Sequence, residues 1–254
     1  MEHLNAQIQA LTQSFAGELH VGLHIQTSEQ TVALNADQQF VAASTMKLAV
    51  YLYYLRQVQA GQIDLASEIV LASEDFVGGA GCLSLFPQKR RWQVVELLQA
   101  MIAVSDNTAT NVLIRHVGLD NLQQLSAEFP GLVIARFMME PSTQQNYITA
   151  STAASLLKAI YDVNDEWVMK PFLQQQFREG LCGLLDEKAI PGLFLYNKTG
   201  RLDGFEHDVA IFRYQNQVVT VAAFSQDLTG RGLGIMWLRA VGAAVFAAMR
   251  LKDE

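Results

Sequence analysis

Charged residues and cysteines are scarce in this sequence, and each shortage excludes a class of protein. Charged side chains make up 17% of the 254 residues, against about 25% in an average chain, which argues against disorder. The 18 basic residues are outnumbered by 25 acidic ones, so the basic face of a general nucleic-acid binder is missing. The two cysteines, Cys82 and Cys182, have no neighbours at metal-ligand spacing. We therefore expect two free thiols rather than a disulfide or a metal site.

Long hydrophobic runs are also missing. The segment nearest to membrane length, residues 232–249, contains Arg239, which would lie near the middle of a bilayer at a cost of about 2.5–3.5 kcal/mol. A C-terminal helix packed on a sheet explains the same residues without that cost. The N-terminus, residues 1–5, lacks the basic and apolar regions of a signal peptide, which leaves a cytoplasmic protein and a mature secreted form as alternatives.

The apolar pattern predicts an α+β fold. Helical spacing is present in residues 1–15, 45–60, 92–104, 109–117 and 150–161, and extended patterns in residues 19–26, 31–34, 193–198, 208–214 and 218–224. Consecutive strands joined by tight turns indicate an antiparallel sheet from which the helices are segregated. We expect one domain of two lobes, a sheet lobe of residues 1–43 and 190–254 and a helical lobe of residues 44–189.

Three short motifs carry groups that can do chemistry: Ser-x-x-Lys at residues 44–47, Ser-Asp-Asn at 105–107 and Lys-Thr-Gly at 198–200. A serine hydroxyl is a poor nucleophile unless a base removes its proton. Lys47 follows Ser44 by one helical turn and can approach it, and burial or a second cation would lower its pKa enough for it to act as that base. Lys198 would supply the second charge and attract an anionic substrate.

The second motif suggests two further roles. Ser105 could pass a proton to a leaving nitrogen, and the Asn107 side chain could hydrogen-bond a substrate amide. Ser-x-x-Lys alone arises about once per 300 positions, and residues 155–158 also fit it. The other two motifs are each expected once per several thousand positions, so the three in this order are very improbable by chance.

This set resembles the signature of the class A β-lactamases and penicillin-binding proteins. The resemblance extends over nearly the whole chain and includes the residues that flank each motif, among them residues 40–47, 101–111 and 207–209. It implies a helical lobe packed on a five-stranded antiparallel sheet, with the active site between them. It also implies an acyl-enzyme on Ser44, substrate binding by Asn107, Lys198, Thr199 and Gly200, and an oxyanion hole from the N–H groups of Ser44 and Arg201. No cofactor is implied, and we expect a monomer that acts on a small molecule.

Two departures from the family pattern bear on function. The family's Ω-shaped loop carries a deacylating Glu and an Asn four residues later; here Glu140 is the candidate base, Gln144 stands where the Asn should be, and Asn146 comes two positions late. The loop is also several residues short. At His207 many relatives carry an arginine for the substrate carboxylate, so this histidine is either a weak carboxylate contact or a hydrogen-bonded strand residue.

The leading interpretation is a serine acyl-hydrolase, a class A-type β-lactamase that hydrolyses the β-lactam amide. One alternative is a penicillin-binding or sensing protein that is acylated without efficient turnover. Another is a hydrolase of small esters or peptidoglycan peptides on the same fold. Glu140 separates the first two, because a deacylation base governs only release of the acyl group.

Overall fold

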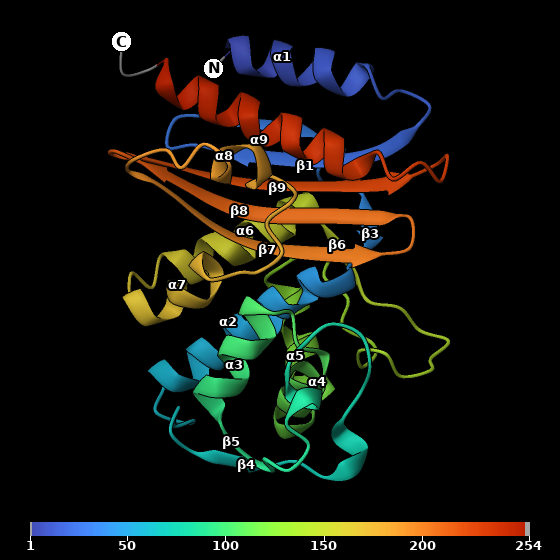
Figure 1. The fold of residues 1–254 in the computed structure, drawn as a ribbon, viewed down its shortest axis with the longest axis vertical. Coiled ribbons are helices and arrows are strands. Elements are labelled where there is room, and N and C mark those ends of the chain that lie inside the picture. Colours follow the sequence, from blue (N-terminus) through green and yellow to red (C-terminus); the bar gives the residue numbers. More distant parts are fainter. Residues whose placement is uncertain (1, 252–254) are drawn as a thin grey trace.

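A computed structural model describes residues 2–251, in which a helical body packs beneath an antiparallel sheet and two helices cover the sheet's other face (Figure 1). Met1 and residues 252–254, included in the predicted sheet lobe, lie outside the described residues. The α-helices are α1 (Glu2–Gln13), α2 (Lys47–Gln59), α3 (Val94–Ala103), α4 (Asn107–Val117), α5 (Leu119–Gln123), α6 (Ala150–Tyr161), α7 (Glu166–Leu173), α8 (Gly183–Asp186) and α9 (Gly234–Arg250). Short 3-10 turns are η1 (Ala43–Met46), η2 (Ser73–Asp75), η3 (Leu83–Leu85) and η4 (Gln124–Ala127).

The main sheet has five antiparallel strands in the order β2-β1-β9-β8-β7. Its members are β1 (Leu19–Gln26), β2 (Thr31–Leu34), β7 (Leu193–Leu202), β8 (Phe205–Tyr214) and β9 (Gln217–Asp227). Two small sheets pair β3 (Gln39–Val41) with β6 (Tyr147–Thr149) and β4 (Glu68–Val70) with β5 (Arg91–Gln93). The predicted fold class is confirmed, since the strands expected from the sequence form this five-stranded antiparallel sheet.

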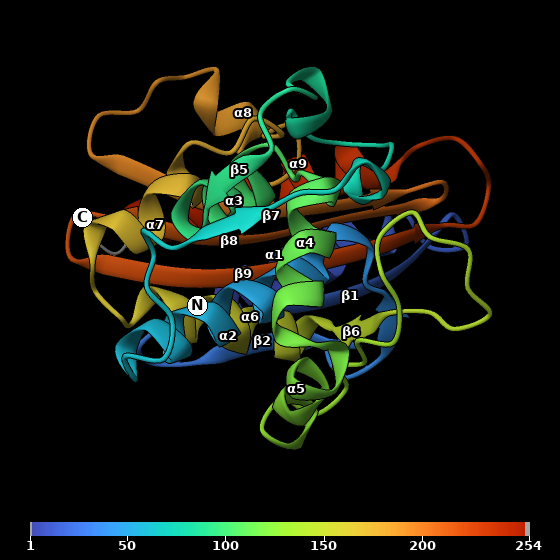
Figure 2. The same ribbon diagram turned by 90° about the horizontal axis from the view of Figure 1, so that it is seen from below.

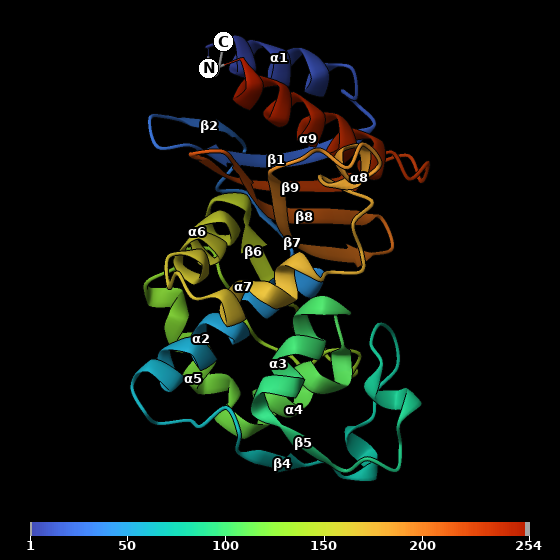
Figure 3. The ribbon, with the colours of Figure 1, turned by 60° about the vertical axis from the view of Figure 1, so that its left-hand side comes forward.

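The middle of each central strand is mostly apolar because both faces of the sheet are buried. Along β8, Val209 and Ile211 pack toward the helical body, whereas Ala210 and Phe212 pack toward α1 and α9. Successive side chains of a strand point to opposite faces, so a strand covered on both sides favours a continuous apolar run. Figure 3 shows α1 and α9 on one side of the sheet and α6 and α7 on the other.

Several element boundaries differ from those predicted. The helix expected at residues 45–60 begins as η1, and α2 starts only at Lys47. Trp92, predicted in a helix, lies in β5, and β7 continues past Gly200 to Leu202. Helix α6 packs on the sheet against β1, β8 and β9. Across residues 2–251, no helix combines the length and the hydropathy that crossing a bilayer requires.

Candidate active site

Ser44 lies in η1, the turn that leads into α2. The preceding residue, Ala43, has a φ of 46°, in the left-handed region that costs a non-glycine residue on the order of 1–2 kcal/mol. Strain of this kind persists only where surrounding contacts hold it, and it concentrates at functional sites. Two hydrogen bonds anchor the turn at Ala42, whose N–H donates to the Asn146 carbonyl at 2.8 Å and whose carbonyl accepts from the Thr45 hydroxyl at 2.6 Å.

Lys47 is the first residue of α2 and is fully buried. Its ammonium donates to the Ser105 carbonyl at 2.6 Å, to the Ser105 hydroxyl at 3.1 Å and to Asn107 Oδ1 at 2.9 Å. Burial, helped by the charge of Lys198, lowers the pKa of Lys47 well below its usual value, which Asp106 only partly offsets. A lowered pKa of this kind favours the neutral amine, which is the form that can accept a proton.

Ser105 connects the two lysines. It lies between α3 and α4 with a φ of 54°, another left-handed non-glycine residue, and is 4% exposed. Its hydroxyl lies 3.1 Å from Lys47 Nζ and 3.0 Å from Lys198 Nζ. The next residue, Asp106, caps α4 by accepting from the Ala109 N–H at 2.8 Å. A single hydroxyl therefore bridges two amines, which is the arrangement a proton relay requires.

Lys198 reaches this hydroxyl from β7, the edge strand of the sheet, and also donates to the Thr199 carbonyl at 2.7 Å. Burial lowers its pKa to about 7, even though Asp208 raises it. Asp208 is itself buried, with a pKa raised by burial to about 7. Among the described residues, no carboxylate is hydrogen-bonded to the ammonium group of Lys47 or of Lys198.

Gly200 allows β7 to approach the Ser44 turn closely. A Cβ at this position would lie 2.9 Å from Thr45 Cγ2, 3.1 Å from the Thr45 nitrogen and 3.2 Å from the Ala42 carbonyl oxygen. These distances are shorter than a relaxed packing contact, so a side chain would push the strand away. Glycine in the third motif thus brings Lys198 and Thr199 to the turn that holds Ser44.

The Arg201 side chain turns away from this cluster and pairs with Glu179 and Glu206 at the surface. Whether its N–H group, with that of Ser44, holds an oxyanion stays a prediction from the family resemblance.

His207 is a buried strand residue. It is 1% exposed, stacks on Phe224 with 4.3 Å between ring centroids, donates to the Val41 carbonyl at 2.9 Å and accepts from the Ser225 N–H at 3.3 Å. Burial lowers its pKa to about 4, although the hydrogen bond to the Val41 carbonyl raises it, so the ring is neutral at pH 7. Of the two roles suggested by the sequence, the structure favours the second, with His207 holding the strand that precedes Ser44.

The Ω-like loop, residues 136–146, is closed at its neck and tied to α4. Asn146 closes the neck, because its side chain accepts from the N–H groups of Ala135 and Arg136 at 2.8 and 3.0 Å. Asn111 on α4 holds the loop by accepting from the Met138 N–H at 2.7 Å and donating to its carbonyl at 2.9 Å. The segment that leads to β6 lies beside α4 in Figure 2.

Glu140, the candidate deacylation base, pairs with Arg115 at 3.0 Å, and its side chain is 40% exposed. Arg115 also binds Asp75 at 2.7 Å. The contacts of Asn111 and Arg115 were not predicted from the sequence. Their spacing of four residues on a predicted helix could have shown that they share a face.

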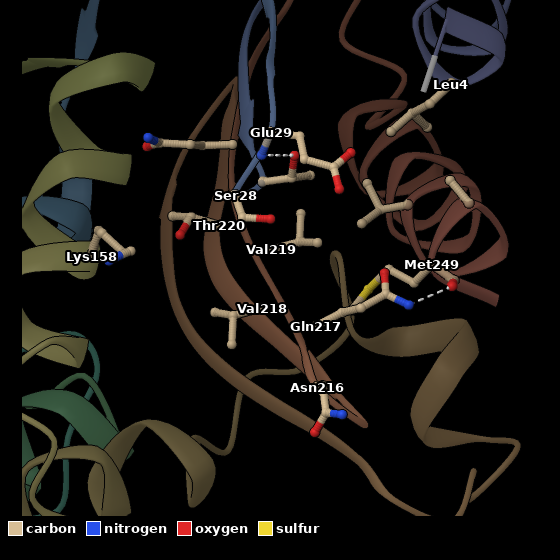
Figure 4. Close-up of a pocket in the computed structure, with 14 residues that line it drawn as sticks. Leu4, Ser28, Glu29, Lys158, Asn216, Gln217, Val218, Val219, Thr220 and Met249 are labelled. Carbon is tan, nitrogen blue, oxygen red and sulfur yellow. Dashed lines mark hydrogen bonds between the residues drawn. The ribbon is translucent and has the colours of Figure 1, made fainter. Parts of the chain in front are cut away.

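Within the described part of the chain, no group of three or more His, Cys, Asp or Glu side chains could hold a metal ion. A cavity of about 760 Å³ lies at the far end of the sheet, between the β1–β2 turn, the start of β9 and the end of α9 (Figure 4). None of the motif residues line it.

Comparisons with known proteins agree with the motif geometry. The model of the β-lactamase enzyme family matches residues 3–249. A β-lactamase from Sphaerobacter thermophilus is 27% identical, covers 97% of both chains and superposes with a TM-score of 0.88. No curated protein shows significant similarity to the chain.

Two further solved structures share the fold at lower identity. A class A β-lactamase from Mycobacterium abscessus is 19% identical, with 97% of this chain and 99% of that chain covered and a TM-score of 0.81. PBP-A is 22% identical, with 98% and 96% covered and a TM-score of 0.83. The fold and the near-complete family match confirm the resemblance inferred from the motifs: this chain belongs to the β-lactamase enzyme family and is a serine hydrolase.

Proposed function

We propose that the chain is a class A-type serine acyl-hydrolase that forms an acyl-enzyme on Ser44 with a β-lactam amide. The observation that carries this proposal is the Ser105 hydroxyl, which lies 3.1 and 3.0 Å from the amines of Lys47 and Lys198. The amines of Lys47 and Lys198 are buried on either side of this hydroxyl, and Lys47 follows Ser44 by one helical turn. Together these groups would form a proton relay beside the nucleophile.

Acylation then needs one proton to move from the nucleophile to the leaving group. Neutral Lys47 removes the proton from the Ser44 hydroxyl, and the Ser44 oxygen forms a bond to the lactam carbonyl carbon. When the carbon–nitrogen bond breaks, the Ser105 hydroxyl protonates the leaving nitrogen and is reprotonated by Lys47. Protonated Lys198 attracts the substrate carboxylate throughout.

The arrangement of these residues supports deacylation less well than acylation. A general base must lie within about 3 Å of the attacking water's proton. Glu140 is instead paired with Arg115, which lies two turns along α4 from Asn107, a rise on the order of 12 Å along the helix axis. The ion pair and the exposure of Glu140 favour a carboxylate that anchors the loop.

The Glu140–Arg115 pair therefore favours a second candidate function, a penicillin-binding protein that is acylated and releases the product slowly. A pre-steady-state trace with a chromogenic cephalosporin, read beside the intact mass, separates the candidates. We expect a burst of one equivalent, a mass adduct that decays slowly, and slow turnover after the burst. Continuous hydrolysis without an adduct would show an efficient β-lactamase, and no reaction at Ser44 would refute acylation itself.

A further inference from the structure

Met139 occupies an unusual place at the edge of the candidate site. Its backbone has a φ of 62°, in the left-handed region, and the residue is 53% exposed. Its sulfur lies 3.4 Å from the point that a Cβ on Gly79 would occupy, and Asn107 Nδ2 lies 2.5 Å from the same point. The thioether and the Asn107 amide therefore flank the same glycine.

Contacts on both sides fix this conformation. The preceding residue, Met138, exchanges two hydrogen bonds with Asn111, and the following residue, Glu140, is paired with Arg115. The left-handed backbone costs a methionine on the order of 1–2 kcal/mol. The exposed side chain does not recover that cost through burial in the core, and strain held without a packing benefit points to function.

The hydrogen bonds of Asn107 show where a substrate would meet Met139. Asn107 Oδ1 accepts from Lys47 and Nδ2 donates to the Gly78 carbonyl at 3.1 Å. An amide nitrogen carries two hydrogens, so one remains for the carbonyl of a substrate's side-chain amide. Because the Met139 thioether lies beside the same glycine, a substituent that continues from that amide would extend toward it.

We propose that Met139 is a specificity-determining residue that contacts the acyl substituent of the substrate and selects apolar substituents. Methionine suits this role because its unbranched, polarizable side chain adapts to ligands of different shape. The inference rests on the proposed acylation of Ser44 and adds the class of substituent that the site prefers.

Two penicillins that differ only in this substituent test the proposal. Benzylpenicillin carries a phenylacetyl group, and the N-acetyl derivative of 6-aminopenicillanic acid keeps the amide with a methyl group instead. The measured quantity is the ratio of their second-order rate constants for acylation. Met139→Asn tolerates the left-handed backbone but removes the apolar surface, and we expect it to lower the ratio about tenfold.

Two more variants complete the design. Met139→Leu restores an apolar side chain and should keep the ratio within about twofold of the wild-type value. Met236→Asn is the matched control, since Met236 is 59% exposed on α9, which covers the opposite face of the sheet from α2 and α4 (Figure 3). An unchanged ratio in Met139→Asn, with acylation intact, would overturn this inference alone. Wild-type protein that neither penicillin acylates would overturn the proposed function, and this inference with it.

Discussion

The guanidinium of Arg115 lies 3.0 Å from the carboxylate of Glu140. The loop acid that the sequence offers as a deacylation base therefore forms an ion pair. Arg115 binds Asp75 with its other terminal nitrogen. One side chain on α4 thus connects the Ω-like loop to the segment that leads toward Gly78 and Gly79. Glu140 contributes to the shape of the site through this link.

Replacing Glu140 tests its role directly. Glu140→Gln keeps the shape of the side chain but cannot accept a proton as a carboxylate does, so we expect the deacylation rate to stay within about threefold of wild type. The measurement is the decay of the benzylpenicillin adduct by intact mass. Glu128→Gln, on another exposed ion pair, is the control. Accumulation of acyl-enzyme only in Glu140→Gln would identify Glu140 as the base.

Ser44 and Ser155 both precede a lysine by three residues, and only Ser44 should react. The Ser155 hydroxyl donates to the Ser151 carbonyl at 2.9 Å on an exposed face of α6, and Lys158 pairs with Asp162. Ser44→Ala should abolish labelling by a penicillin or fluorophosphonate probe, whereas Ser155→Ala should label like wild type. Equal labelling of wild type and Ser44→Ala would refute the assignment of the nucleophile.

The pKa of Lys198, about 7, predicts how acylation depends on pH. As pH rises through 7, Lys198 loses its charge, so acylation by anionic benzylpenicillin should fall on the alkaline side. A neutral ester, p-nitrophenyl acetate, should show no such fall. Both substrates should react more slowly in acid, because protonation of Lys47 removes the base.

Lys198→Ala is the variant that checks this assignment. It should remove the difference between the two alkaline profiles and weaken binding of the anionic substrate, and that loss should shrink in high salt because ions screen the attraction. Lys47→Ala should instead lower acylation of both substrates about 10²–10⁴-fold. Identical alkaline profiles for the two substrates in wild-type protein would contradict the role of Lys198.

Gly200→Ala should move β7 away from the turn that holds Ser44. The new Cβ would lie 2.9 Å from Thr45 Cγ2, so we expect a loss of about 1–3 kcal/mol in the free energy of unfolding and at least a tenfold drop in acylation. Gly78→Ala is the matched control, because no atom lies within 4 Å of its added Cβ. Equal stability and acylation in the two variants would show that the close approach is not needed.

His207 should stay neutral until about pH 4, which NMR titration of its ring can follow. Its pKa is lower in the folded protein than in the unfolded chain, so the unfolded chain binds the proton first. Stability should therefore be complete above about pH 6.5 and decline as pH falls toward 4. Titration of the His207 ring near pH 6.5 in the folded protein would contradict its burial.

The sequence by itself determined the strands of the main sheet, the longer helices and the three motifs, because all of these depend on short-range order. Alternating apolar residues predicted β1, and helical spacing predicted α6, with the boundaries that the structure shows. Ser44 and Lys47 could be paired because three residues make nearly one turn of a helix. The three motifs and their order along the chain identified the family, but they did not show how far apart the motif side chains lie in space.

Only the tertiary structure decided which groups the side chains of Glu140 and His207 contact. Glu140 meets an arginine 25 residues away in the chain, and His207 meets the Val41 carbonyl 166 residues away. No local pattern marks such pairs, since they arise when packing brings distant segments together. Burial then sets the pKa of His207 and Lys198, because the cost of charging a group depends on the surrounding protein and on the water it has lost.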